Sequence, residues 1–93
     1  MICDFCSSHA PAWLYPADTF LDQYNSVSQG DWLACDECHG LIEAGDRASL
    51  ANRVLLTDVV RSGLVDKKLA RRYARDLHDR FFRSRRGEAH SLK

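Results

Sequence analysis

The four cysteines of this chain fall into two Cys-x-x-Cys pairs, Cys3 with Cys6 and Cys35 with Cys38, separated by 28 residues. Each short loop can turn two sulfurs to one side, and the intervening segment can fold back to bring the pairs together. A chain of 93 residues buries only a small core, so a metal would add much to its stability. The sequence therefore predicts one closed tetrahedral site that holds a single structural Zn²⁺.

Other uses of the four thiols are less favoured. A redox dithiol needs nearby cations or a helix N-terminus, whereas the cysteine loops carry Asp4, Asp36 and Glu37. Disulfides need an oxidising compartment, but no signal peptide or membrane span is recognisable, and we expect a reducing cytoplasm. An iron–sulfur cluster could use the same four thiolates. His9 and His39 lie beside the pairs, but four cysteines already complete the site, so we place both histidines outside it.

Short strands and turns are predicted between the cysteine pairs. Residues 12–15 and 31–34 have the aromatic and apolar character of strands, and 19–24 is a weaker third candidate. Turn residues occupy 25–26 and 28–30. Six of the nine aromatic residues lie between positions 5 and 32, and we expect most of them to build the core.

Helical patterns follow the second cysteine pair. The first helix starts near Asp36 and ends at a Gly45 C-cap. Asp46 would cap a second helix that ends at 62–63, and Asp66 a third, reaching about residue 83. The expected apolar stripe of the third helix is Leu69, Ala70, Tyr73, Ala74, Leu77 and Phe81.

These patterns predict an α+β fold in a single domain, residues 1–93. A small zinc-stapled β-hairpin module of treble-clef or zinc-ribbon type would occupy 1–45. Two or three α-helices, including a basic amphipathic C-terminal helix, would occupy 46–86. Residues 87–93 show no periodicity and are expected to fray.

The first half of the chain resembles small, functionally uncharacterised zinc-binding proteins of actinobacteria and their phages, which hold the ion with four cysteines. The resemblance lies in Cys3-Asp-Phe-Cys6, in Trp13-Leu-Tyr15-Pro16-Ala17 and in the segment from Gly30 to Asp46. It covers about residues 1–50, implies a zinc site and implies no activity.

An enzyme is not expected. A catalytic zinc needs an open coordination position, which four thiolates do not leave. Some treble-clef proteins are nucleases with a His-Asn-His constellation beside the zinc, but His39 and Asn52 do not reproduce that order.

The net charge of zero conceals two oppositely charged parts. Residues 1–60 carry two basic against nine acidic side chains, a net charge of −7. Residues 61–93 carry eleven basic against four acidic side chains, a net charge of +7. Such a division predicts a charged partner, or two parts that partner each other.

The predicted partner-binding residues lie on or near one face of the C-terminal helix: Lys68, Arg71, Arg72, Arg75, Arg83 and Arg86. This face could contact an acidic protein, including the acidic part of its own or another copy in a homo-oligomer, or nucleic-acid phosphates. It could also be a solvated surface with i,i+4 pairs to Asp76 and Asp79. An anionic membrane, contacted through residues 81–82, is the least favoured choice.

The sequence thus favours a non-catalytic, zinc-stabilised interaction module or small regulator that binds a protein partner through its C-terminal helix. The alternative is a nucleic-acid-binding regulator that uses the same basic face. Truncation at about Gly63 is expected to leave the zinc module soluble but to remove binding.

Overall fold

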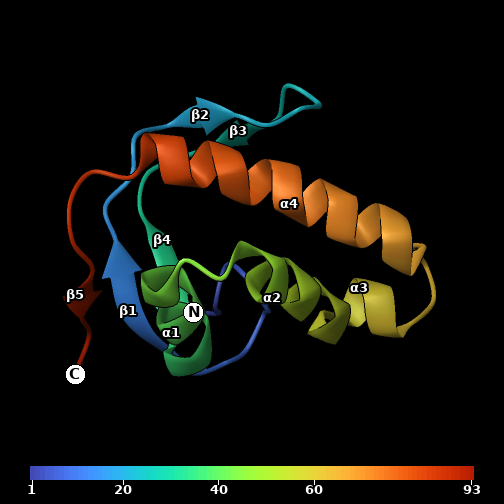
Figure 1. Ribbon diagram of the computed structural model, residues 1–93, viewed down its shortest axis with the longest axis horizontal. Coiled ribbons are helices and arrows are strands. Elements are labelled where there is room, and N and C mark those ends of the chain that lie inside the picture. The colour runs from blue at the N-terminus through green and yellow to red at the C-terminus, as the bar shows by residue number, and fades with distance from the viewer.

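The computed structural model describes residues 1–93 and has the α+β fold expected from the sequence (Figure 1). Its main sheet is antiparallel, with β1 between β4 and β5, and a separate two-stranded hairpin joins β2 to β3. The strands are β1 (Pro11–Tyr15), β2 (Phe20–Leu21), β3 (Val27–Ser28), β4 (Trp32–Cys35) and β5 (His90–Ser91).

All of the helices lie between β4 and β5 in the sequence. In Figure 1 the longest of them crosses the molecule beside the others. They are α1 (Asp36–Ala44), α2 (Arg47–Asn52), the 3₁₀ helix η1 (Arg53–Leu56), α3 (Asp58–Arg61) and α4 (Lys67–Ser84). The predicted caps are confirmed: Gly45 ends α1 in the left-handed conformation, at φ 70°, and Asp46 and Asp66 accept hydrogen bonds at the starts of α2 and α4. None of the helices is both long and apolar enough to cross a membrane.

The single helix expected from Asp46 to residues 62–63 is instead broken into α2, η1 and α3. Thr57 is extended, with ψ 150°, and its hydroxyl donates a hydrogen bond to the Val54 carbonyl at 2.6 Å. A threonine side chain that bonds its own backbone in this way competes with helix continuation. Arg53, the first residue of η1, lies close to the cysteines, as described below.

The tail expected to fray at 87–93 contains β5 in this structure. Trp13 and Leu14 pair with Ser91 and His90, and the Leu92 amide donates to the Ala12 carbonyl at 2.9 Å. The expectation was wrong because the open edge of β1 can pair with a nearby extended segment. Such pairing requires no periodic pattern in the sequence of the tail.

One buried cluster holds the sheet, the cysteines and the helices together. Phe81 of α4 is fully buried, and its ring centroid lies 4.9 Å from that of Trp32 and 5.2 Å from that of Phe5. Most of the aromatic residues therefore build the core as expected, although Tyr24 is 73% exposed. The members of the cluster are Cys3, Phe5, Cys6, Tyr15, Ala17, Trp32, Ala34, Cys35, Cys38, Ile42, Leu50 and Phe81.

The buried face of α4 differs in part from the expected stripe. Its buried residues are Ala70, Ala74, His78 and Phe81. Leu69 was expected to be buried but is 58% exposed. The packed face of α4 is thus turned toward His78, while Leu69 lies at the exposed edge of a groove beside the helix.

Candidate metal centre

The structure brings the four predicted ligands together. The Sγ atoms of Cys3, Cys6, Cys35 and Cys38 all lie within 4.8 Å of one another, and all four residues are buried. The Cys6 and Cys35 sulfurs are 3.7 Å apart, and no disulfide is present. Four sulfurs around a zinc ion, at Zn–S distances of about 2.3 Å, would lie about 3.8 Å apart, whereas a disulfide requires about 2.05 Å. The cluster therefore has the geometry to hold a metal ion.

Local backbone structure holds each pair of sulfurs in place. The Phe5 amide donates to the Cys3 Sγ at 3.4 Å, and the Cys38 amide donates to the Cys35 Sγ at 3.5 Å. Cys35 is at once the last residue of β4 and the N-cap of α1, so its sulfur faces the amides of the first helical turn. Such N–H groups stabilise negative charge on sulfur.

Asp4 fastens the first pair of cysteines to the strand that leads to the second. Its amide donates to the Leu33 carbonyl at 2.8 Å, and its carboxylate accepts from the Leu33 amide at 2.7 Å. These two bonds place the Cys3–Cys6 loop directly beside β4. The two cysteine pairs, 28 residues apart in the sequence, are thus brought together by hydrogen bonds between Asp4 and Leu33.

Burial and the neighbouring sulfurs oppose ionisation of all four thiols together. A hydrogen bond from Cys38 lowers the pKa of Cys3 to about 4, and the same bond, together with burial, raises the pKa of Cys38 above its usual range. Burial also raises the pKa of Cys6. One negative charge in the cluster therefore opposes the next, and a divalent cation would relieve this repulsion.

Arg53 is a residue of the site that sequence reasoning missed. Its Nε donates to the Cys38 Sγ at 3.1 Å, and its Nη2 lies 3.7 Å from the Cys6 Sγ and 4.0 Å from the Cys35 Sγ. Its Nη1 also pairs with Glu37 at 2.8 Å. No local signal marks Arg53, because it stands well beyond the second cysteine pair and meets the sulfurs only in the folded chain.

The two neighbouring histidines lie outside the cysteine cluster, which contains no histidine. His9 is exposed. The His39 ring stacks on Trp13 with a centroid distance of 3.8 Å, and its Nδ1 is 2.7 Å from the Tyr15 hydroxyl. That hydroxyl also donates to Glu43 at 3.0 Å. His39 is therefore held by an aromatic and hydrogen-bonding network beside the site.

The predicted partner-binding residues are all at least partly exposed. Arg86, just beyond α4, pairs with Asp18 at 3.1 Å. The other five form no salt bridge: Lys68, Arg71, Arg72, Arg75 and Arg83. The expected pairs of Asp76 and Asp79 within the helix do not form, and Asp79 instead contacts Arg47 at 2.9 Å.

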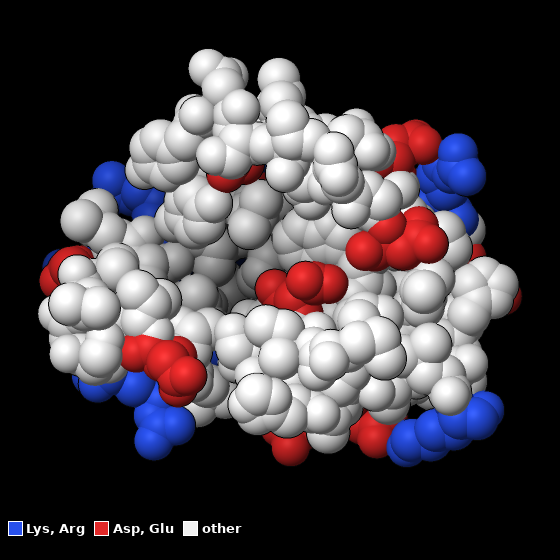
Figure 2. Space-filling view, turned by 180° about the vertical axis from the view of Figure 1, so that it is seen from behind, with Lys and Arg blue, Asp and Glu red and all other residues white.

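The acidic part of the chain is only partly matched by the basic tail. Apart from the Arg86 pair, Arg85 lies 3.9 Å from Glu43, and Lys93 lies 3.1 Å from Asp36. Figure 2 shows the face opposite to that of Figure 1, where Lys and Arg side chains lie around the rim and the charges nearest the middle are acidic. Four ion pairs thus join the two oppositely charged parts, while several basic side chains of α4 stay unpaired.

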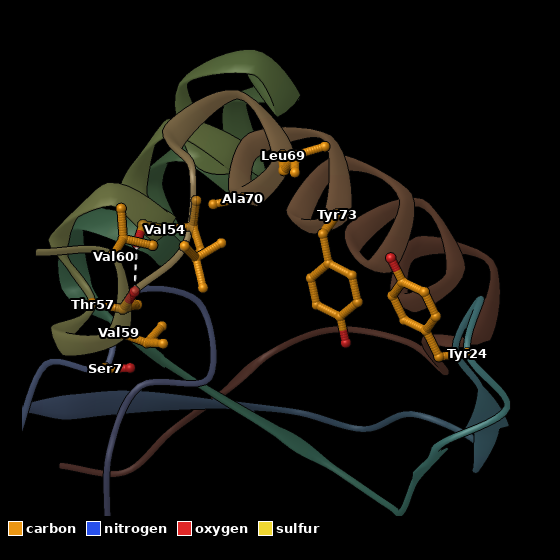
Figure 3. Close-up of a pocket in the computed structure, with 10 residues that line it drawn as sticks. Ser7, Tyr24, Val54, Thr57, Val59, Val60, Leu69, Ala70 and Tyr73 are labelled. Atoms are coloured by element: carbon orange, nitrogen blue, oxygen red, sulfur yellow. Dashed lines mark hydrogen bonds between the residues drawn. The ribbon is translucent and has the colours of Figure 1, made fainter. Parts of the chain in front are cut away.

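An apolar groove of about 490 Å³ runs beside α4 (Figure 3). The rings of Tyr24 and Tyr73 stack at one end, with centroids 5.6 Å apart. Leu69 and Val59, which also line the groove, are 58% and 48% exposed. Arg72 adjoins this groove in a smaller hollow that shares Tyr24, Leu69 and Tyr73 with it and also contains Asp76. The full lining is Ser7, Tyr24, Val54, Thr57, Val59, Val60, Val65, Leu69, Ala70 and Tyr73.

Comparisons with family models, curated proteins and solved structures found no match to this chain. The resemblance described for residues 1–50 therefore stays a prediction. What is known of the site rests on its own geometry.

Proposed function

We propose that the chain is a non-catalytic interaction module, stapled by one structural zinc ion, that binds an acidic protein segment through α4. The observation that carries this proposal is the set of five exposed basic side chains on α4 that form no salt bridge.

The zinc assignment rests on the donor set and its surroundings. Four buried thiols within 4.8 Å of one another match the closed structural sites that zinc occupies. Cys3, Cys6, Cys35 and Cys38 would hold the ion, which would supply the charge that lets all four ionise together. Because thiolates would fill every coordination position, the site supports the fold and offers no position for a substrate.

The partner is inferred to be acidic because the basic side chains have no internal partner. Lys68, Arg71, Arg72 and Arg75 recur at helical spacing on α4, and other basic residues of the tail already pair with carboxylates. Charges displayed in this way speed and orient association with a surface of opposite sign.

A protein is favoured over a nucleic acid because apolar surface adjoins the basic residues. Leu69 is exposed on the same helix as Arg72, and the two share a hollow beside the groove. Exposed apolar surface beside arginine is typical of protein interfaces, whose centres are apolar and enriched in aromatic residues and Arg. The −7 charge of residues 1–60 would also repel phosphates within a Debye length of about 8–10 Å.

Nucleic acid is the second candidate function. The five unpaired basic side chains lie between residues 68 and 83 of one continuous helix, a length of about 22 Å. Such a stripe can follow several phosphates, and its binding would weaken steeply with salt.

Binding measurements can separate the two candidates. The zinc-loaded protein is titrated into a labelled amphipathic peptide that is built from Glu and Leu. It is also titrated into random-sequence duplex DNA and single-stranded DNA. Each titration is carried out at roughly 50 and 200 mM salt. The triple variant R71A/R72A/R75A removes three charges from the face. The double variant R61A/K67A, which alters exposed basic residues nearby, is the control.

Peptide binding that is lost in the triple variant and retained in the control supports the proposal. DNA binding that collapses with salt, without peptide binding, would transfer the function to nucleic acid. Failure to bind either ligand at the lower salt concentration would refute an anion-binding role for α4.

A further inference from the structure

Arg53 occupies the one side of the cysteine cluster that approaches the surface. Cys3 and Cys38 are 0% exposed, whereas Cys6 and Cys35 are 4% and 6% exposed. Two surface hollows reach these more accessible cysteines, one of about 220 Å³ that includes Cys35 and one of about 370 Å³ that includes Cys6. Arg53 and Ser8 line both hollows, and the Arg53 Nη2 lies 3.7 Å from the Cys6 sulfur and 4.0 Å from the Cys35 sulfur.

The position of the Arg53 guanidinium suits the negative charge that four metal-bound thiolates would carry. Four thiolates and one divalent cation carry a net charge of −2, which is costly in a buried site. The guanidinium reaches the sulfurs of Cys38 and Cys6 with separate nitrogens, at 3.1 and 3.7 Å. The planar, permanently charged guanidinium carries its donors on three separate nitrogens, whereas a lysine ammonium has a single nitrogen, so arginine suits contacts with two sulfurs and a carboxylate at once.

Glu37 contacts this guanidinium from the solvent side. Its carboxylate is 2.8 Å from the Arg53 Nη1, and its side chain is 76% exposed, whereas the Arg53 side chain is 19% exposed. An ion pair with so exposed a partner is weak. The contacts with the Cys38 and Cys6 sulfurs are therefore the main contacts that keep Arg53 over the cluster.

We propose that Arg53 is the gate of the metal centre. It covers the sulfurs of Cys6 and Cys35 and offsets the charge of the thiolates, so loss of the ion and modification of these two cysteines both require its displacement. This inference rests on the proposed zinc site and adds to it an ordered reactivity, in which Cys6 and Cys35 react before Cys3 and Cys38.

The test compares zinc-loaded wild type with R53M, which removes the charge, and R53K, which keeps the charge but loses the fork. R61M is the matched control, because Arg61 lines the Cys6 hollow but donates to no sulfur. The first readout is the rate of zinc transfer to excess 4-(2-pyridylazo)resorcinol. Changes in groups that support metal ligands commonly alter metal affinity by about 10–100-fold. We expect R53M to release zinc roughly tenfold or more faster than wild type, R53K to fall between them, and R61M to match wild type.

The second readout is the order of alkylation by N-ethylmaleimide, followed by peptide mass spectrometry. A thiolate sulfur adds to the maleimide double bond, forming a C–S bond, and the other alkene carbon takes a proton from water, with no leaving group and no redox change. We expect R53M to label Cys6 and Cys35 first, whereas general unfolding would label all four cysteines together.

Zinc release from R53M within twofold of the wild-type rate, or equal labelling of the four cysteines, would overturn the gate. The purified proteins are also assayed for bound metal before either experiment. Wild type without one zinc ion per chain would overturn the proposed metal centre itself and the gate with it, whereas stoichiometric zinc with unchanged release would overturn the gate alone.

Discussion

His78 is a buried histidine whose ring lowers the stability of the fold at acidic pH. It is 3% exposed, its Nδ1 has no hydrogen-bond partner, and its ring centroid is 5.1 Å from that of Phe5. Burial lowers the pKa of His78 from 6.5 to about 4, against a small opposing effect of Asp79. In the unfolded chain the same ring would titrate near its ordinary pKa, so between these two values the unfolded state binds the additional proton.

We predict that stability is lost as the pH falls from about 6.5 toward 4, by up to about 3 kcal/mol from His78 alone. Well above pH 6.5 both states are neutral at this position and the effect vanishes. Urea unfolding of wild type and H78L at several pH values checks this. Both proteins retain the cysteine cluster, so the difference between their profiles isolates His78, and parallel profiles would contradict the prediction.

The ligand assignment leads to a second prediction for single residues. C38S should lose stoichiometric zinc and most tertiary structure, because the remaining sulfurs cannot close the site and metal binding is coupled to folding. The double variant H9A/H39A should keep one zinc ion per chain. Metal analysis and near-ultraviolet circular dichroism measure both, and zinc retention by C38S with a wild-type spectrum would refute the four-thiolate site.

The cysteines could be assigned from the sequence because a metal site needs ligands at short, recognisable spacings. Arg53 and His78 could not. A charged or polar residue that faces a core has no spacing of its own, and its role depends on distant chain segments that fold against it. Sequence reasoning therefore found the cysteine cluster but missed Arg53, whose guanidinium contacts three of its sulfurs.

At the scale of elements, the β2–β3 hairpin is fastened by Asp22. Its carboxylate accepts hydrogen bonds from the Tyr24 and Ser26 amides, both at 2.8 Å, and from the Tyr73 hydroxyl of α4 at 2.9 Å. The amide bonds and the Tyr73 bond lower the pKa of Asp22 despite the opposing effect of burial. One side chain thus shapes the turn and docks the hairpin on the helix.

We predict that D22A destabilises the protein by about 2–3 kcal/mol, because hydrogen bonds to charged groups are among the stronger ones. D18A, which removes a carboxylate from the exposed pair with Arg86, should cost less than about 1 kcal/mol. Denaturant unfolding compares the two variants. Amide exchange should also quicken at Tyr24 and Ser26 in D22A, and equal effects of the two variants would contradict this role for Asp22.

The elements could be predicted where their signals are local. Gly45, Asp46 and Asp66 act within one helical turn, and the structure confirms all three caps. The strand at 90–91 and the Arg53 contact with Cys38 each join segments that are distant in sequence. The α+β class followed from local signals, whereas these two details required the tertiary structure.

At the scale of the whole molecule, the cysteine site and α4 share one core. Phe81 is 0% exposed and packs against Phe5, Tyr15 and Trp32, three rings from the part of the chain that carries the cysteines. Removing α4 would expose all three rings beside the metal site. The division of charge between residues 1–60 and 61–93 therefore does not divide the core.

This shared core changes what truncation near Gly63 should do. We now predict that residues 1–63 alone do not form a stable zinc module, because they lose Phe81 and His78 from the face that covers Phe5. The smaller change F81A, within the full chain, should cost about 3–5 kcal/mol, as expected for emptying a fully buried aromatic site. The zinc-loaded full chain, its F81A variant and residues 1–63 are compared by the chemical-shift dispersion of their NMR spectra and by thermal unfolding.

L69A is the control within the full chain, because it removes a large apolar side chain that is 58% exposed on the same helix. It should cost much less than F81A, since less of its surface leaves water on folding. Well-dispersed spectra and cooperative unfolding of zinc-loaded 1–63 would show that the module folds alone. In that case α4 would be an appended binding element, and loss of binding on truncation could be attributed to its basic face instead of to unfolding.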